Sequence, residues 1–171
     1  LPNNQGKGFA VKMGALNSVG NRVIFLDADG ATPISEISRL DQALDNGADI
    51  AIGSRAKKSD ETSISTIWYR KLLGRVFNNV VNFILLPGIE DTQCGFKMFT
   101  AESASKVFKL QTSKGFSFDV EILYLARKLK LKVVEVAINW QNVPGSKVNL
   151  IVDSLKMFKD IFKFKFIHRK I

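Results

Sequence analysis

The order of hydrophobic and polar residues along the chain predicts an α/β domain. An apolar run at 23–26 stops abruptly at two aspartates and a glycine, which is typical of a buried strand that ends in a turn. Apolar runs at 49–53 and 132–138 predict two further strands. Amphipathic segments separate these runs, and strands that alternate with helices favour a sheet with helices packed on it.

Helical spacing of apolar residues predicts the segments between the strands. Helices are expected at 9–16, from Thr32-Pro33 to Asn46-Gly47, and around 123–129. A longer helix is predicted over 64–86, and it is apolar nearly all round in its second half. We therefore expect it to be a core helix with one edge that faces a membrane.

The C-terminal segment also has helical spacing, with phenylalanine on one side and lysine on the other. The expected apolar face carries Ile151, Leu155, Phe158, Phe162 and Phe166. The lysines that lie toward the other face are Lys156, Lys159, Lys163 and Lys170. This composition is typical of a helix that lies in a membrane interface. The alternative is a core-packing helix whose basic face is solvated.

Length and charge narrow the possible partners. The chain has 171 residues and a formal net charge of +9, which fits one globular domain with a basic surplus. Residues 147–171 hold seven Lys or Arg against two Asp, so an anionic partner, phospholipid or nucleic acid, is expected at that end. The single cysteine, Cys94, excludes an intramolecular disulfide. The sequence contains no run of the roughly 20 apolar residues that a membrane span needs.

The strongest candidate chemistry lies at the end of the first predicted strand. Asp27 and Asp29 are two positions apart, so their carboxylates would point to the same side. Ligands of open α/β sheets bind beyond the carboxyl ends of the strands. Two hard oxygen ligands there suit Mg²⁺ or Mn²⁺ that carries a diphosphate. The alternative is that Asp29-Gly30 is only a turn and Thr32-Pro33 only a helix cap.

Other polar groups fall at similar places in the pattern. Lys7 stands between two glycines before a helix, where backbone and ammonium can approach a phosphate. Arg55 follows the second predicted strand and is a candidate for anion binding, although a surface ion pair is equally consistent with it. Residues 91–97 form a polar patch between apolar segments. Asp119 and Glu121 are also consistent with acids that complement a helix dipole.

Several of these stretches occur together in one order. They read G-K-G before a helix, D-A-D-G-A-T, G-S-R, D-T-Q-C-G-F-K, F-D-x-E and N-W-x-x-x-x-G-S-K. Together they resemble the family-2 GT-A glycosyltransferases that load sugar onto polyprenyl phosphate, from about Asn4 to at least Lys147. The resemblance implies a GT-A (Rossmann-like) mixed sheet flanked by helices and incomplete at the N-terminus. It implies a catalytic domain over 1–148 and a membrane-associating amphipathic helix over 149–171.

The resemblance is greatest to the branch of the family that glucosylates dolichyl phosphate. It implies transfer of glucose from UDP-glucose to dolichyl phosphate with inversion, for protein N-glycosylation. It also implies a membrane surface as partner, at the cytosolic face of the endoplasmic reticulum. The sequence leaves the donor nucleotide open, so a related mannosyl- or hexosyltransferase is one alternative. A catalytically inert fragment is another. A basic nucleic-acid-binding domain is disfavoured, since no recognition motif is present.

The resemblance further implies roles for individual residues. Those near the donor would be Lys7, Asp27, Asp29, Gln93, Asp119 and Glu121. The acceptor phosphate would lie near three basic groups: Arg55, Arg70 and Lys147. Catalysis would rest on Asp29, Arg55 and Asp91, and the metal, Mg²⁺ or Mn²⁺, on Asp27 and Asp29.

Overall fold

The structure is a computed structural model that describes residues 3–57, 59–65, 68–143 and 150–171. The first half of the chain forms α1 (Lys7–Leu16), β1 (Arg22–Leu26), the 3-10 helix η1 (Ile34–Glu36), α2 (Ile37–Asp45), β2 (Ile50–Ser54), β3 (Ile64–Ser65) and α3 (Trp68–Ile84). The second half forms β4 (Phe96–Thr100), α4 (Ala101–Leu110), α5 (Phe118–Lys128), β5 (Val133–Ala137), β6 (Trp140–Gln141) and α6 (Leu150–Ile167).

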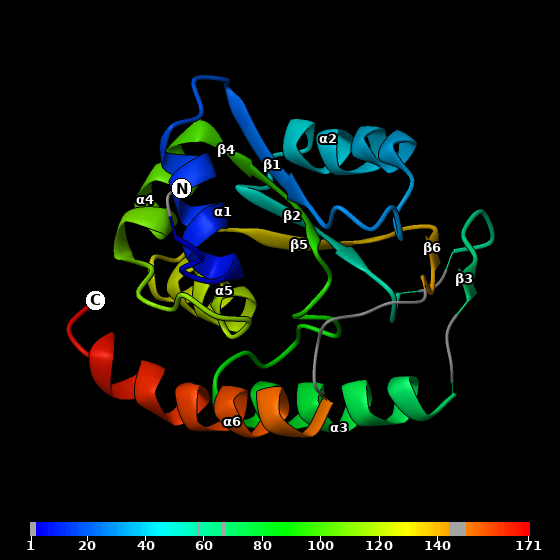
Figure 1. Cartoon of the computed structure of the whole chain (residues 1–171). Helices are drawn as coiled ribbons and strands as arrows, with labels where there is room; N and C mark the ends of the chain where they lie inside the picture. The colour runs from blue at the N-terminus through cyan, green and yellow to red at the C-terminus, as the bar shows by residue number, and fades with distance from the viewer. Residues whose placement is uncertain (1–2, 58, 66–67, 144–149) are drawn as a thin grey trace.

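Four strands form one mixed sheet in the order β1-β4-β2-β5. The central strand β4 runs antiparallel to both β1 and β2, whereas β2 and β5 are parallel. The carboxyl ends of β1, β2 and β5 therefore meet at one edge, and Figure 1 shows β2 running toward β3 and β6 at that edge. The α/β class and the mixed sheet predicted from the sequence are confirmed.

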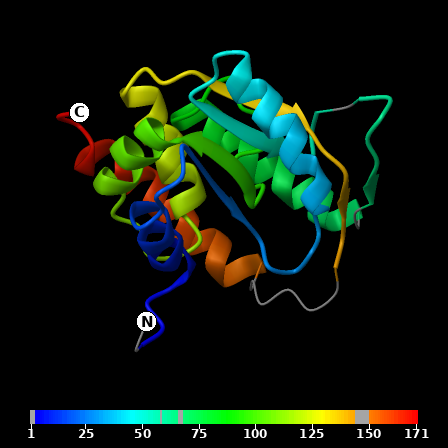
Figure 2. The same cartoon turned by 90° about the horizontal axis from the view of Figure 1, so that it is seen from above.

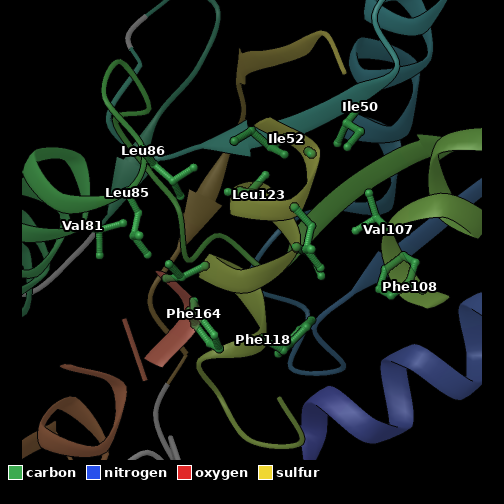
Figure 3. Close-up of a cluster of buried hydrophobic side chains, with 14 of the residues drawn as sticks. Ile50, Ile52, Val81, Leu85, Leu86, Val107, Phe108, Phe118, Leu123 and Phe164 are labelled. Atoms are coloured by element: carbon green, nitrogen blue, oxygen red, sulfur yellow. The ribbon is translucent and has the colours of Figure 1, made fainter. Parts of the chain in front are cut away.

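Alternation of side chains along the strands divides the core between the two faces of the sheet. On one face, Ala51 and Met98 pack with Leu40 and Leu44 of α2, which crosses the sheet in Figure 2. The other face carries the larger hydrophobic cluster, and Figure 3 shows its side chains in close-up. Its labelled members come from β2, α3 and the segment after it, α4, α5 and α6: Ile50, Ile52, Val81, Leu85, Leu86, Val107, Phe108, Phe118, Leu123 and Phe164.

Two parts of the sequence pattern were interpreted wrongly. The polar patch at 91–97 was interpreted as a loop, but its last two residues begin the central strand β4, and neither this strand nor α4 after it was predicted. The long helix predicted from residue 64 begins only at Trp68, because Ile64 and Ser65 pair with β6. Strand pairing between distant segments decided both, and local periodicity carries no signal for such pairing.

The helices α3 and α6 lie side by side beneath the sheet in Figure 1. Phe77 of α3 contacts Phe158 of α6, with ring centroids 5.3 Å apart. Met157, Ile161 and Phe164 of α6 belong to the large core cluster. The C-terminal helix is thus packed on the domain along one side.

The predicted apolar face of the C-terminal helix needs correction. Phe162 and Phe166 were expected to share one apolar face with Phe158, but Phe158 packs on α3 whereas the other two are exposed. The packed face instead carries His168 together with the three core residues of α6, as the 3.6-residue repeat places them on one stripe. The side chains of Ile151 and Leu155 lie outside the described part. Among the helices described, none is long and apolar enough to cross a bilayer.

Candidate functional site

The two aspartates that follow β1 lie in one place, as the sequence predicted. Asp27 and Asp29 line the same small hollow, together with Trp140. The Oδ1 atom of Asp29 accepts a hydrogen bond from the backbone N–H of Ala31 at 3.0 Å, and Gly30 has a φ of 73°. The segment is therefore a turn, and both of its aspartates line one hollow.

Asp27 is held from two sides. Its Oδ1 atom lies 2.6 Å from Nζ of Lys7, and its backbone N–H donates to the carbonyl of Gly95 at 2.8 Å. A Cβ added to Gly95 would lie 2.1 Å from Oδ2 of Asp27. The carboxylate thus rests against bare backbone, and any larger residue at this position would displace it.

The lysine is positioned by the glycines around it. Gly6 has a φ of 97°, and a Cβ there would lie 2.3 Å from the carbonyl oxygen of Lys114. A Cβ on Gly8 would lie 2.7 Å from the carbonyl oxygen of Ser113. Burial opposes the charged form, but the carboxylates of Asp119, Asp27 and Asp29 together raise the pKa of Lys7. Lys7 is therefore a fixed positive charge beside the two aspartates.

Arg55 forms a second charged centre at the end of β2. Its Nε and Nη2 atoms donate to the two carboxylate oxygens of Asp91 at 2.7 and 2.8 Å, and its backbone N–H adds a bond of 2.9 Å. Despite burial, the charge and hydrogen bonds of Asp91 raise the pKa of Arg55. Burial likewise opposes the ionised form of Asp91, but Arg55 lowers the pKa of this carboxyl. The Arg55 side chain remains 35% exposed, so the residue is only partly enclosed by the protein.

Trp140 connects these two centres. The residue is among those that line the hollow beside Asp27 and Asp29, and the centroid of its ring lies 5.4 Å from the Arg55 guanidinium carbon. The aspartate pair and the arginine therefore belong to one site at the carboxyl edge of the sheet.

A third ion pair lies in the interior next to this site. Lys97 of β4 has a fully buried side chain, and its ammonium contacts Asp119 and the carbonyl of Cys94, each at 2.5 Å. Burial raises the pKa of Asp119, although Lys97 and Lys7 both oppose the shift. Burial also raises the pKa of the Cys94 thiol to about 12, so the thiol stays protonated at neutral pH. Asp119 is thus paired with the buried Lys97 and is not among the residues that line the hollow.

Two other predicted donor residues point elsewhere. Both oxygens of Glu121 accept hydrogen bonds: from Thr112 at 2.9 and 2.6 Å, and from Ser113 at 2.7 Å. His168, directly after α6, also lies 2.8 Å from Glu121. Glu121 therefore joins the segment before α5 to the C-terminal helix. The Nε2 atom of Gln93 contacts Sδ of Met157 on α6 at 3.6 Å.

The remaining predicted groups are described only in part. Arg70 belongs to α3, but its side chain lies outside the described part of the structure, as does Lys147 entirely. Sequence reasoning assigned no role to Lys97, Gly95 or Trp140. A lysine inside the apolar stretch Phe-Lys-Met-Phe is a signal that could have indicated a buried ion pair.

The aspartate pair fits a divalent cation. Within the described residues, no group of three or more His, Cys, Asp or Glu side chains is placed to hold a metal ion. Magnesium and manganese at sugar-nucleotide sites need fewer protein ligands, since substrate phosphates and water complete the shell. The two carboxylates, one half-buried and one exposed, are hard oxygen donors of that kind.

Comparison with known proteins agrees with this geometry. Residues 1–108 match the family model described as glycosyl transferase family 2. The chain is 40% identical over 167 residues to dolichyl-phosphate beta-glucosyltransferase of Homo sapiens, covering 94% of this chain and 52% of that protein. It is 40% identical over 171 residues to the enzyme of the same name from Dictyostelium discoideum, covering 97% and 52%. The chain thus spans about half the length of the curated relatives it matches.

A solved structure supports the fold. Glucosyl-3-phosphoglycerate synthase from Mycobacterium tuberculosis, in complex with Mn²⁺, UDP-glucose and phosphoglyceric acid, superposes with a TM-score of 0.68. The sequence identity is 16%, and the match covers 93% of this chain and 54% of that one. The shared fold and the family model lead to the same conclusion. The chain belongs to glycosyl transferase family 2.

Proposed function

We propose that the protein transfers glucose from UDP-glucose to dolichyl phosphate with inversion at the anomeric carbon. The observation that carries this proposal is the pairing of two charged centres in one site. A carboxylate pair with a lysine suits a metal-bound diphosphate, and an arginine held by a carboxylate suits a second phosphate. The relatives that match most of this chain carry the name of that activity.

The donor half of the site is built on Asp27, Asp29 and Lys7. A divalent cation, Mg²⁺ or Mn²⁺, held by the two aspartates would neutralise the diphosphate that leaves the sugar. The synthase of the same fold was solved in complex with Mn²⁺ and UDP-glucose, which is consistent with this assignment. Lys7 contributes a positive charge that the neighbouring carboxylates keep protonated. It also limits the repulsion between the diphosphate and the two aspartates.

The acceptor half is built on Arg55. The nucleophile is a phosphate oxygen whose second pKa lies near 6, so it arrives largely ionised at the pH of the cytosol. A strong general base is then not needed, and the harder task is to bring two anions together. The bidentate bond to Asp91 uses one edge of the guanidinium, and an arginine has five N–H groups. The other edge can therefore bind the acceptor phosphate, with Asp91 as its positioning partner.

The lipid tail of the acceptor requires a site beside a bilayer. The outer side of α3 exposes Leu72, Val76 and Phe83, and the outer side of α6 exposes Phe162 and Phe166. Phe83 is 94% exposed and Phe166 76%. Lysines of α6 surround the two phenylalanines: Lys156, Lys159, Lys163 and Lys165. Exposed aromatic rings among lysines favour a membrane surface with anionic lipids, which we assign to the cytosolic face of the endoplasmic reticulum.

A vesicle experiment tests this outer surface. The double variant Phe162→Ser/Phe166→Ser is expected to bind phosphatidylserine-containing vesicles at least about tenfold more weakly, since burying one phenylalanine contributes about 1.5–3 kcal/mol. Sedimentation with vesicles gives the affinity. The matched control, Val19→Ser/Ile34→Ser, removes two exposed apolar side chains elsewhere and should bind as the wild type does. Equal binding by all three proteins would contradict the assignment.

A substrate assay tests the reaction itself. The intact protein in membranes, with Mg²⁺ or Mn²⁺, is expected to convert UDP-glucose and dolichyl phosphate to dolichyl β-D-glucosyl phosphate. Parallel reactions with GDP-mannose and other UDP-hexoses measure donor preference. A preference for GDP-mannose would reassign the protein to a mannosyltransferase, and no product with any donor would overturn the proposed activity. Extraction of the labelled lipid and analysis of the anomeric linkage identify the product.

A further inference from the structure

Trp140 occupies the boundary between the two halves of the site. Trp140 is one of the residues that line the hollow of Asp27 and Asp29. The Arg55 guanidinium lies over its ring, with the central carbon 5.4 Å from the centroid. Trp140 is half-buried.

The backbone around Trp140 is tied to both neighbouring segments. Its N–H donates to the carbonyl of Ser63 at 3.0 Å, so that β6 pairs with β3. The N–H of Gln141 donates to the carbonyl of Ala31 at 2.9 Å, directly after the aspartate turn. Ala31 is in turn bonded to Asp29. The short strand β6 therefore fixes the indole relative to the aspartate turn.

The chemistry of the contact with Arg55 is specific. A guanidinium is flat and weakly hydrated, so it stacks on an aromatic ring more readily than an ammonium does. Asp91 holds this guanidinium by one edge. A bond along one edge still permits tilting, and an aromatic surface beside the plane restricts that tilt. Asp91 and Trp140 together determine the direction in which the outer edge of Arg55 donates.

We propose that Trp140 is a positioning residue for the acceptor phosphate. It acts through Arg55: the ring holds the guanidinium so that its outer N–H groups point to a phosphate monoester next to the metal-bound diphosphate. This inference rests on the proposed function and assigns the phosphate of the acceptor to the Arg55 side of the indole.

The test compares Trp140→Leu with Trp140→Phe in the intact protein. The leucine variant keeps an apolar side chain but removes the aromatic surface, whereas phenylalanine retains a ring. We expect Kd for a short polyprenyl phosphate and KM for dolichyl phosphate to rise about 5- to 30-fold in Trp140→Leu, as cation–π pairs contribute at this level. KM for UDP-glucose and the melting temperature should change little. Trp140→Phe should recover most of the acceptor affinity.

A double-mutant cycle shows whether the effect passes through Arg55. In an Arg55→Met background, Trp140→Leu should cause less than about a twofold further change, because the positioned group is absent. An equal loss in both backgrounds, unchanged acceptor binding in Trp140→Leu, or equal weakening of UDP binding would each overturn the proposal. So would a wild type that does not bind the polyprenyl phosphate. A wild type that binds the phosphate but makes no product would instead contradict the proposed function. The binding measurements on the Trp140 variants would then still decide whether Trp140 positions Arg55.

Discussion

Asp29→Asn is expected to abolish almost all glucosyl transfer while leaving the fold intact. The asparagine side chain keeps an oxygen that can accept the hydrogen bond from the N–H of Ala31, so the turn after β1 should persist. What is lost is one of the two negative charges that would hold the divalent cation. Loss of this electrostatic stabilisation should lower kcat by about 10²- to 10³-fold. Initial rates with UDP-glucose and dolichyl phosphate measure the loss.

The control for this variant is a carboxylate outside the site. Asp41 forms an ion pair with Arg22 on the surface, and Asp41→Asn should retain full activity. The melting temperatures of both variants should stay close to that of the wild type. Normal activity of Asp29→Asn at saturating metal would refute the metal role of this residue, and a large fall in its melting temperature would show that the turn needs the charge.

Asp91→Asn is expected to cause the largest loss of stability among site substitutions. Asp91 is buried, and three hydrogen bonds from Arg55 end on its carboxylate. Asparagine presents an NH₂ group to these donors and leaves the guanidinium without its counter-charge. Removal of one partner of a buried pair costs about 3–5 kcal/mol, which corresponds to a fall in Tm on the order of 10 °C. Thermal unfolding monitored by circular dichroism measures it.

The difference in Tm between wild type and Asp91→Asn should depend on pH in a direction set by the pKa of Asp91. Burial opposes ionisation of Asp91, but Arg55 lowers its pKa below the ordinary value of 3.8 that applies in the unfolded chain. A carboxyl with a lowered pKa stabilises the fold above its unfolded pKa and loses that contribution as pH falls through its folded pKa. The difference in Tm between wild type and Asp91→Asn should therefore be complete at pH 7 and shrink below about pH 4.

A second variant separates stability from function. Replacing the whole pair, Arg55→Met/Asp91→Leu, removes the buried carboxylate together with its partner and should recover much of the stability lost in Asp91→Asn. It should remain defective toward dolichyl phosphate, because the acceptor arginine is absent. A stable Asp91→Asn protein, or a pH-independent difference in Tm, would show that Arg55 does not depend on this carboxylate.

Much of the site could be predicted because its residues stand at ends of strongly patterned segments. The aspartates follow the apolar run of β1, and Arg55 follows that of β2. Because ligands of open α/β sheets bind beyond the carboxyl ends of the strands, these residues were predicted to lie at one edge of the sheet. The partners of the charged groups were not predictable in this way. Asp119 and Glu121 stand at the start of a helix, where acids are common, and only the fold shows that Lys97 and the segment at 112–113 bind them.

Local sequence was sufficient to establish the α/β class, the strands that carry the charged groups, and the family to which the chain belongs. Those features depend on periodicity and on short ordered motifs, which neighbouring residues encode. Three others became visible only in the folded chain: Lys97 is buried against Asp119, Trp140 contacts Arg55, and Phe158 packs on Phe77. These depend on which distant segments pack together, and side chains far apart in sequence acquire a common environment only when the sheet and helices assemble.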